Sequence, residues 1–317
     1  MKQVKHLALE ITAFCNETCI HCYHPADRVA EQIDNTPLLD RMLHEFGELG
    51  FIFLTITGGE PLLHPEFRDI CMKAQKHRYA ISVKTNGTLI DDDIAEFLGN
   101  LKPLNVEISL YSADPDEHDA VTCIRDSFFR SLEGIKKLKE KAVNVSVMTP
   151  VMNGIKNWTG LYLMMKELGI TWHCSPHIHS SFDERNGVEQ FKGTAQSHME
   201  FLEFVNKHED QKIQNIDSLC FQECGGGETV ACIGPDLSLR ACITFPEKAG
   251  IYTGGNGPEL LSEARRQLKK RFSLLKCHNC ELLNFCNPCP AMKNDCDTGR
   301  LEYAKAMKSS ISVLTKQ

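Results

Sequence analysis

Residues 6–22 read HLALEITAFCNETCIHC, an apolar stretch typical of a β-strand followed by three cysteines in the spacing C-x3-C-x2-C. A loop with this spacing can place three thiolates around one corner of an inorganic cluster. A cubane [4Fe–4S] cluster takes four ligands, usually thiolates. Three close cysteines therefore indicate a cluster with one iron left for chemistry. The alternatives are a zinc loop, although zinc sites favour cysteine pairs, and three buried cysteines.

Apolar, β-branched stretches recur downstream of this loop. With the first stretch they predict strands at 6–12, 51–57, 79–85, 105–111, 143–149 and 170–174. Helical patterns lie between them at 36–49, 65–77, 91–98, 127–141 and 157–168. Such alternation predicts parallel strands joined by crossover helices. We therefore expect an α/β fold, a partial (β/α)6 TIM-type barrel whose mouth is wide enough for a large substrate.

The alternation ends after residue 174, and from about residue 217 the composition shifts to Cys, Gly and Pro. Further helices are predicted at 194–208, 260–275 and 300–314. We expect the barrel to span 1–210, with a bridging segment at 175–210. A small, Cys-rich and loop-rich domain with a C-terminal helix follows at 211–317.

Composition narrows the class of protein. The net charge of −7 over 317 residues argues against nucleic acid as a partner. No run of 18 apolar residues predicts a membrane span, and the N-terminus lacks a signal-peptide core, so we expect a cytoplasmic protein. Its 15 cysteines, concentrated at 15–22 and 224–296, are then expected to be metal ligands rather than disulfides.

Polar and glycine-rich motifs follow the predicted strands. Gly58-Gly59-Glu60-Pro61 follows the second strand, Asn86 the third, and Ser109 lies near the end of the fourth. Chemistry in parallel α/β folds is carried by these carboxyl ends, so the sequence predicts one active site there, together with the cysteine loop. Glycines lack a Cβ and let a backbone approach a ligand closely. The alternative is that these residues form ordinary turns and strand-end caps.

The cysteine spacing, with Tyr23 after it and Gly58–Pro61 after the second strand, resembles the radical S-adenosylmethionine (SAM) enzymes. His21 occupies the aromatic position of their signature. The resemblance implies that Cys15, Cys19 and Cys22 hold a [4Fe–4S] cluster. It also implies that the open iron takes the amino and carboxylate groups of SAM. One electron then cleaves the sulfonium and yields a 5′-deoxyadenosyl radical.

The same resemblance implies further contacts with SAM. Residues Gly58, Gly59, Glu60 and Pro61 would grip its amino group, and Asn86 and Ser109 would contact the ribose and the carboxylate. Arg125 would pair with that carboxylate, unless it is a surface arginine. His21 would cover the adenine side with Tyr23 beside it, unless both are packing residues.

The second cysteine block contains C-x2-C-x5-C-x2-C, a strong metal signal for which a zinc ribbon is the alternative. It resembles the SPASM extension of radical SAM enzymes, which carries two auxiliary [4Fe–4S] clusters. The resemblance implies a nearer cluster on Cys224, Cys232, Cys242 and Cys289, and a farther one on Cys277, Cys280, Cys286 and Cys296.

Two positions depart from the SPASM pattern. Leu237 stands where that pattern has glycine, and two residues rather than three separate Cys286 from Cys289. Cys220 is an alternative to Cys232 as a ligand. If Cys220 is not a ligand, we expect it to be a hydrogen-atom donor near the cavity or a small buried residue.

The resemblance implies a maturase that abstracts hydrogen from a ribosomally synthesised peptide and installs a thioether or carbon–carbon crosslink or another modification. The alternatives are a peptide epimerase using Cys220, a sulfatase-maturase-like oxidase, a radical enzyme acting on a small molecule, and a non-enzymatic Fe–S or zinc module. Since the chain begins directly at the first strand, we expect a separate leader-recognition protein or direct binding at the barrel mouth. A flavodoxin- or ferredoxin-type protein is the expected electron donor.

Overall fold

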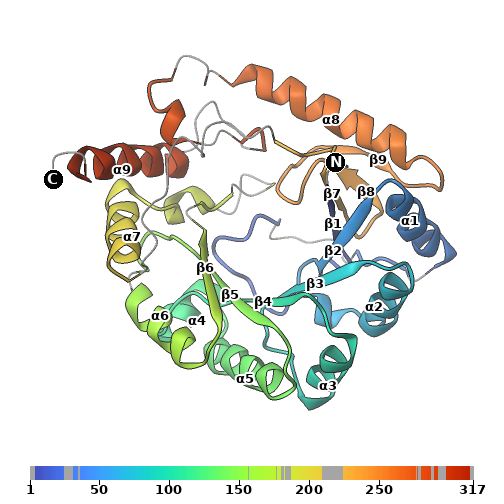
Figure 1. Ribbon diagram of the computed structural model, residues 1–317, viewed down its shortest axis with the longest axis horizontal. Helices are drawn as coiled ribbons and strands as arrows, with labels where there is room; N and C mark the ends of the chain where they lie inside the picture. Colours follow the sequence, from blue (N-terminus) through green and yellow to red (C-terminus); the bar gives the residue numbers. More distant parts are fainter. Residues whose placement is uncertain are drawn as a thin grey trace.

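Six parallel strands lie side by side in chain order (Figure 1). They are β1 (Lys5–Glu10), β2 (Phe51–Thr57), β3 (Ala80–Thr85), β4 (Asn105–Ser109), β5 (Val145–Pro150) and β6 (Thr171–Ser175). The computed structural model describes residues 4–24, 31–34, 36–155, 157–175, 177–179, 182, 187–208, 224–275, 277, 280–286, 289–291 and 298–314. The predicted α/β class and partial barrel are confirmed, with all six predicted strands present.

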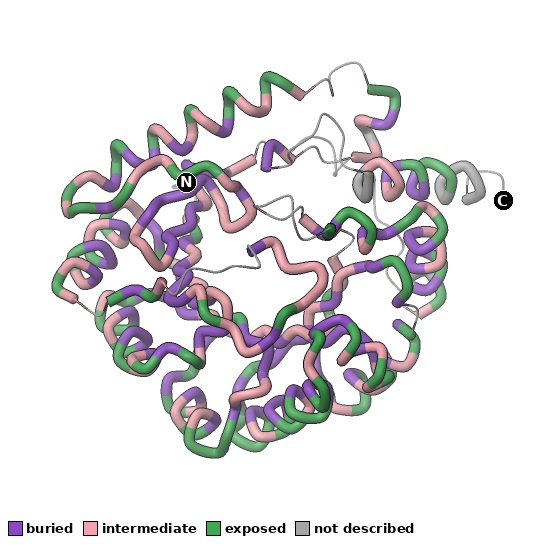
Figure 2. Tube along the Cα trace, turned by 180° about the vertical axis from the view of Figure 1, so that it is seen from behind, coloured by how far each residue is buried: buried purple, intermediate pink, exposed green. Residues whose placement is uncertain are grey.

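Helices form an outer layer around the curved row of strands (Figure 1). They are α1 (Pro37–Glu48), α2 (Phe67–Lys76), α3 (Asp92–Leu101), α5 (Ser127–Glu140) and α6 (Trp158–Glu167). Each turns an apolar stripe toward the strands, and along much of β1 to β5 buried residues alternate with half-buried or exposed ones (Figure 2). One continuous core therefore holds the strands and the helical layer together.

A short helix that the sequence analysis did not predict, α4 (Pro115–Thr122), follows β4. Asp114 caps it by accepting hydrogen bonds from the backbone N–H groups of Asp116 and Glu117, and Pro115 occupies the first turn. Aspartate at the N-cap followed by proline is a helix-start signal. The helix is only eight residues long, so its apolar periodicity is weak.

The C-terminal part of the chain continues the same sheet. β7 (Val230–Ile233) pairs in parallel with β1, opposite the side on which β2 lies. β8 (Ser238–Arg240) and β9 (Lys248–Ile251) then add antiparallel strands at that edge. The sequence analysis did not predict these short strands. The domain boundary predicted near residue 210 lies outside the described residues and stays a prediction.

Three more helices complete the described fold. α7 (Ala195–His208) and α9 (Thr298–Leu314) pack against each other beyond β6. α8 (Gly257–Leu274) lies along β9, near the other edge of the sheet. All three correspond to predicted helices. No described helix has the length and apolar character needed to cross a membrane.

Glu45 on α1 connects the two parts of the chain. Its carboxylate accepts hydrogen bonds from the backbone N–H groups of Gly257 at 2.7 Å and Gly255 at 2.8 Å, and from the Tyr252 hydroxyl at 2.5 Å. Gly257 is the first residue of α8, and a negative charge at a helix N-terminus is stabilising. Glu45 therefore fixes the C-terminal strands and α8 against α1.

We predict that Glu45→Ala lowers the free energy of unfolding by about 2 kcal/mol, because three donors lose their acceptor. Urea unfolding monitored by circular dichroism measures this. The matched control is Glu48→Ala on the exposed face of the same helix, with an expected change within about 0.5 kcal/mol. Equal effects of the two substitutions would contradict the role of Glu45.

Candidate functional site

The cysteine loop begins just beyond the carboxyl end of β1, and α4 supports its middle. The backbone N–H of Thr18 donates to the carbonyl of Thr122 at 3.1 Å, and that of Ile20 donates to the carbonyl of Val121 at 3.0 Å. These bonds hold the segment between the first and third cysteines against the end of α4. The unpredicted helix is thus part of the support of the site.

The three thiols are half-buried and interact electrostatically. Burial raises the pKa of Cys19 well above its ordinary value, and the charges of Glu17, Cys22 and Cys15 raise it further. Cysteines bind metal as thiolates, and these three neighbouring side chains can supply three ligands to one positively charged centre. The set of donors therefore fits the three-cysteine corner of an iron–sulfur cluster.

The predicted glycine turn packs against the chain that leads into the cysteine loop. Gly59 N–H donates to the carbonyl of Thr12 at 2.8 Å, and Glu60 N–H donates to that of Phe14 at 2.7 Å. A Cβ on Gly58 would lie 2.3 Å from the Thr12 oxygen, and one on Gly59 would lie 2.1 Å from the Phe14 oxygen. Both glycines are required by this approach of backbone to backbone. Their predicted contact with the amino group of SAM stays a prediction.

Glu60 is fully buried and bridges the ends of β2 and β3. One carboxylate oxygen accepts from Leu62 N–H at 3.0 Å and from the Thr85 hydroxyl at 2.7 Å, and the other accepts from Asn86 N–H at 2.7 Å. Burial raises its pKa to about 7, against these hydrogen bonds. The carboxylate therefore positions the turn, with Pro61 buried beside it.

An amide cluster joins the cysteine loop to the end of β3. The Asn86 side chain donates to Asn16 Oδ1 at 2.8 Å, and Asn16 Nδ2 donates to the Thr88 hydroxyl at 2.8 Å. Thr88 N–H and its hydroxyl both donate to Asn86 Oδ1, at 3.0 and 2.8 Å. Asn86, predicted to contact SAM, thus also orients the residue next to Cys15. The sequence analysis missed Asn16, although its place between two cysteines was a signal.

Tyr111 forms one wall of the loop and was also missed. Its ring packs edge-on against the ring of His21, with 4.9 Å between the centroids. Its hydroxyl lies 3.9 Å from the Cys19 sulfur and is hydrogen-bonded to the side chain of Ser109. Burial lowers the pKa of His21 to about 4, so its ring is neutral. The buried His21 Nε2 has no hydrogen-bond partner among the described residues, which leaves a polar atom for a bound group.

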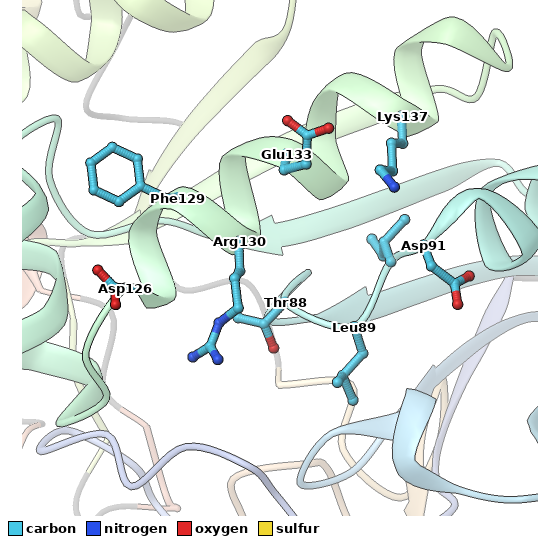
Figure 3. A pocket seen from close by; sticks show the side chains of 9 residues that line it. Thr88, Leu89, Asp91, Asp126, Phe129, Arg130, Glu133 and Lys137 are labelled. Carbon is cyan, nitrogen blue, oxygen red and sulfur yellow. The ribbon is translucent and has the colours of Figure 1, made fainter.

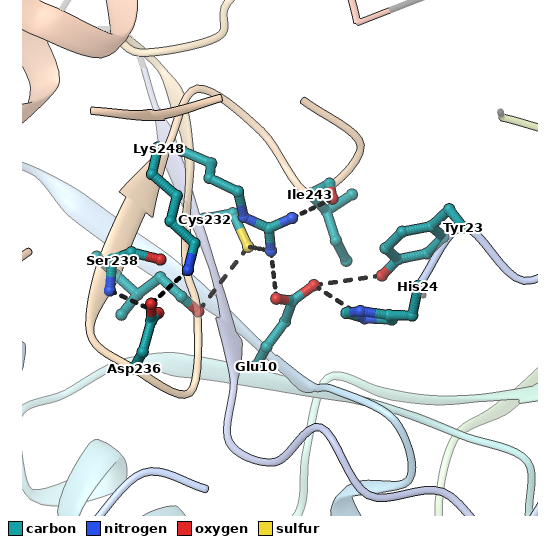
Figure 4. A network of polar contacts seen from close by, with 10 residues as sticks. Glu10, Tyr23, His24, Cys232, Asp236, Ser238, Ile243 and Lys248 are labelled. Carbon is teal, nitrogen blue, oxygen red and sulfur yellow. Dashed lines mark hydrogen bonds and ion pairs between the residues drawn. The ribbon is translucent and has the colours of Figure 1, made fainter. Parts of the chain in front are cut away.

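A buried ion pair lies behind Tyr23 (Figure 4). Glu10 on β1 pairs with Arg240 on β8, and Tyr23 hydroxyl donates to Glu10 at 3.3 Å. Burial alone would raise the pKa of Glu10, but His24 and Arg240 hold it below its ordinary value. The network connects the residues after the cysteine loop to the C-terminal strands.

Arg240 also brings one cysteine of the second block into this network. Its guanidinium Nη2 lies 3.2 Å from the sulfur of Cys232, which is fully buried on β7 (Figure 4). Cys232 and Cys224 both interact electrostatically with Cys242. The structure therefore brings three cysteines of the predicted nearer set together.

The structure describes some of the remaining cysteines of the second block. Cys289 packs on the same core as Cys224 and Cys242, and Cys277, Cys280 and Cys286 lie in one short turn region. Cys220 and Cys296 lie outside the described residues. The ligand partition stays a prediction.

Leu237 has a backbone φ of 61°, in the left-handed region that favours glycine. This explains why the SPASM pattern has glycine at this position. Leu237 lies in the turn between β7 and β8, just before the strand that carries Arg240.

Arg125 lies at the surface after α4, with its side chain 93% exposed and 3.7 Å from Asp126. The structure does not bring it together with the buried site residues, and its predicted pairing with SAM stays a prediction. Within the described residues, no three His, Cys, Asp or Glu side chains are arranged to hold a single metal ion.

The comparisons with known proteins agree with this arrangement. The family model described as "Radical SAM superfamily" matches residues 9–160, from β1 to α6. This segment belongs to the radical SAM superfamily. The family implies a [4Fe–4S] cluster and SAM. The matched segment contains both the cysteine loop and the Gly58–Pro61 turn. The cysteine-rich C-terminal part fits a SPASM-like domain.

Two relatives and one solved structure indicate the range of similar proteins. The subtilosin biosynthesis protein AlbA of Bacillus subtilis (strain 168) is 27% identical over 255 residues, which are 78% of this chain and 56% of AlbA. The AdoMet-dependent heme synthase of Methanosarcina barkeri is 27% identical over 170 residues, 53% of this chain and 49% of the synthase. The chain thus spans about half the length of the curated relatives it matches.

The structure of anSMEcpe with bound AdoMet and Cp18Cys peptide superposes with a TM-score of 0.74 and 17% identity, covering 98% of each chain. This likeness establishes the fold, including the C-terminal part, which the radical SAM family model does not reach.

We predict that Gly59→Ala destabilises the protein by about 1–3 kcal/mol and lowers the iron taken up by the radical SAM domain, since the new Cβ forces Phe14 and the loop entry apart. Thermal unfolding and iron analysis after anaerobic reconstitution measure both effects. The control is Gly47→Ala in α1, where the nearest atom to a new Cβ is 3.8 Å away. Normal iron uptake by Gly59→Ala would contradict the role of this contact.

Proposed function

We propose that the protein is a radical SAM peptide maturase, which abstracts a hydrogen atom from a ribosomally synthesised peptide to install a thioether or carbon–carbon crosslink or another modification. The observation that carries this proposal is the cysteine loop held between the Gly58–Gly59 turn, the Asn16–Asn86 contact and α4. The AlbA match, which extends over 78% of the chain, supports a peptide as the substrate.

In this proposal Cys15, Cys19 and Cys22 hold the cluster that binds SAM and supplies the electron for its cleavage. The chain's own residues orient the loop and exclude water. Thr18 and Ile20 are held by α4, Asn16 is held by Asn86, and the buried Tyr111 and His21 pack beside Cys19. We further propose that Gly58–Pro61, Asn86 and Ser109 bind SAM.

We also propose that the SPASM-like part holds two auxiliary clusters. Cys224, Cys242 and Cys289 would hold the nearer one together with Cys232 or Cys220. Cys277, Cys280, Cys286 and Cys296 would hold the farther one. With four protein ligands each, they would have no open iron for substrate and would relay electrons. A flavodoxin- or ferredoxin-type donor and a separate leader-recognition protein complete the proposed partners.

A radical enzyme acting on a small molecule is the second candidate, because the match to the heme synthase covers half of the chain. Within the peptide class, epimerisation with Cys220 as hydrogen donor and sulfatase-maturase-like oxidation also remain candidates. A non-enzymatic Fe–S or zinc module explains the second cysteine block but not the buried contacts around the first.

We predict that Cys19→Ala abolishes 5′-deoxyadenosine formation from SAM with dithionite and removes about four irons per chain, the content of one cubane. Liquid chromatography and iron analysis on anaerobically reconstituted protein measure these losses. The control is Cys123→Ser, an exposed cysteine after α4, which should retain both activity and iron. Persistent SAM cleavage by Cys19→Ala would contradict the assignment.

A second prediction concerns the substrate. Short peptides encoded beside the gene are incubated with the loaded protein, SAM and reductant, and analysed by mass spectrometry. A crosslink removes two hydrogen atoms, whereas epimerisation leaves the mass unchanged in water and adds one deuterium in heavy water. If SAM cleavage is stimulated by a small molecule and by none of these peptides, the small-molecule candidate replaces the peptide maturase.

A further inference from the structure

Tyr111, two residues beyond β4, is fixed beside the cysteine loop by contacts on several sides. Its backbone N–H donates to His118 Nδ1 at 3.2 Å. Its ring packs against the rings of His118 and His21, with 5.3 and 4.9 Å between centroids. Only 4% of Tyr111 is exposed. Because α4 and the loop both hold the ring, its hydroxyl stays directed at the sulfur of Cys19.

The Tyr111 hydroxyl is a hydrogen-bond donor to Cys19. It lies 3.9 Å from the Cys19 sulfur and is also hydrogen-bonded to the side chain of Ser109. A phenol hydroxyl has one proton, and its oxygen can accept a hydrogen bond at the same time. Tyr111 can therefore accept from the Ser109 hydroxyl while it donates its own proton to the sulfur.

Metal binding by Cys19 strengthens this hydrogen bond. In the thiol form, Cys19 donates to Glu17 Oε2 at 3.4 Å. A cysteine that binds iron is a thiolate with no proton to donate, so the bond to Glu17 is lost and the sulfur can only accept. Hydrogen bonds to a charged acceptor are shorter and stronger than those to a neutral one. The donor that remains at this sulfur is the Tyr111 hydroxyl.

We propose that the Tyr111 hydroxyl raises the reduction potential of the cluster held by Cys15, Cys19 and Cys22, by donating a hydrogen bond to the Cys19 sulfur. The inference rests on the proposed function. Reduction adds one negative charge to the cluster, so a donor at a ligand sulfur stabilises the reduced form more than the oxidised form. The electron comes from the one-electron donor protein, and Tyr111 keeps its proton throughout. Tyr111 is thus a positioning residue that eases delivery of the electron needed for SAM cleavage.

A surface charge is a different way to shift this potential, and the structure separates it from Tyr111. Arg130 on α5 interacts electrostatically with Glu17. It is exposed and lines a groove together with Thr88 (Figure 3). Solvent and salt screen a charge at the surface. The effect of Arg130 should therefore be smaller than that of a buried hydroxyl in contact with the sulfur.

The test is Tyr111→Phe in the full-length protein, reconstituted anaerobically with iron and sulfide. This change keeps the ring and removes only the hydroxyl. Redox titration followed by electron paramagnetic resonance, without SAM, measures the potential of the cluster whose signal Cys19→Ala lacks. At a fixed potential we expect the ratio of reduced to oxidised cluster to fall about threefold or more. This corresponds to about 30 mV, since a tenfold change in a one-electron equilibrium is about 59 mV.

Two further measurements test the hydrogen bond itself. Proton electron–nuclear double resonance of the reduced wild-type protein should show a coupling that disappears in deuterated buffer, and Tyr111→Phe should lack it. Placing 3-fluorotyrosine at position 111 by amber suppression makes the hydroxyl a stronger donor in a ring of nearly the same size. This protein should have a higher potential than the wild type, and its fold does not depend on the Phe substitution.

Two control variants accompany these measurements. Tyr79 is also buried, and its hydroxyl donates to the carbonyl of Leu43 at 2.7 Å, just before β3 and at the opposite end of that strand from the cysteine loop. Tyr79→Phe removes the same group and should leave the ratio of reduced to oxidised cluster unchanged. Arg130→Gln should change this ratio less than about twofold, because its charge is screened.

The proposal is overturned by a potential in Tyr111→Phe equal to that of the wild type, or by an equal shift in Arg130→Gln. A potential that 3-fluorotyrosine leaves unchanged or lowers would also overturn it. If Cys19→Ala keeps every signal of the wild type, the assignment of Cys19 as a ligand is wrong instead. A wild-type protein that cleaves no SAM with dithionite would overturn the proposed function.

Discussion

The cysteine loop depends on one close backbone approach, that of Gly58 and Gly59 to Thr12 and Phe14. No side chain fits between these two backbone segments, so the cysteine loop can begin here only because the turn after β2 has glycine at positions 58 and 59. The carboxylate of Glu60 then fixes the end of β3 to the same turn. Contacts from the ends of three strands thus hold the loop in place, and preorganised positions of this kind are what a cluster-binding site needs.

A second constraint joins this loop to the cysteine-rich part of the chain. β7 pairs with β1, so both parts share one sheet, and the Glu10–Arg240 pair is buried where they meet. Two buried charges are tolerated because they are paired and hydrogen-bonded. The same guanidinium reaches Cys232, so the loop and the second cysteine block belong to one polar network. This proximity suits electron exchange between them in the proposed mechanism.

The sequence was informative where the signal is local. Long apolar, β-branched stretches predicted β1 to β6, and cysteine spacing predicted the loop that the radical SAM match includes. β7 to β9 were missed because strands of three or four residues leave little pattern. Tyr111 and Arg240 were missed because their partners are far apart in sequence. Glu10, a charged residue within the apolar stretch predicted as the strand at 6–12, was the available signal. Arg125 was proposed as a partner of the SAM carboxylate because arginine suits a carboxylate. The structure instead places its side chain at the surface, away from the buried site residues.

The central claim is that an iron at the cysteine loop binds SAM directly. The most direct test is electron paramagnetic and electron–nuclear double resonance of the reduced, loaded protein, before and after addition of SAM labelled with nitrogen-15 at its amino group. The account predicts that SAM changes the signal of one cluster and that this cluster couples to the labelled nitrogen. Spectra that are identical with and without SAM, and no coupling to the label, would contradict it.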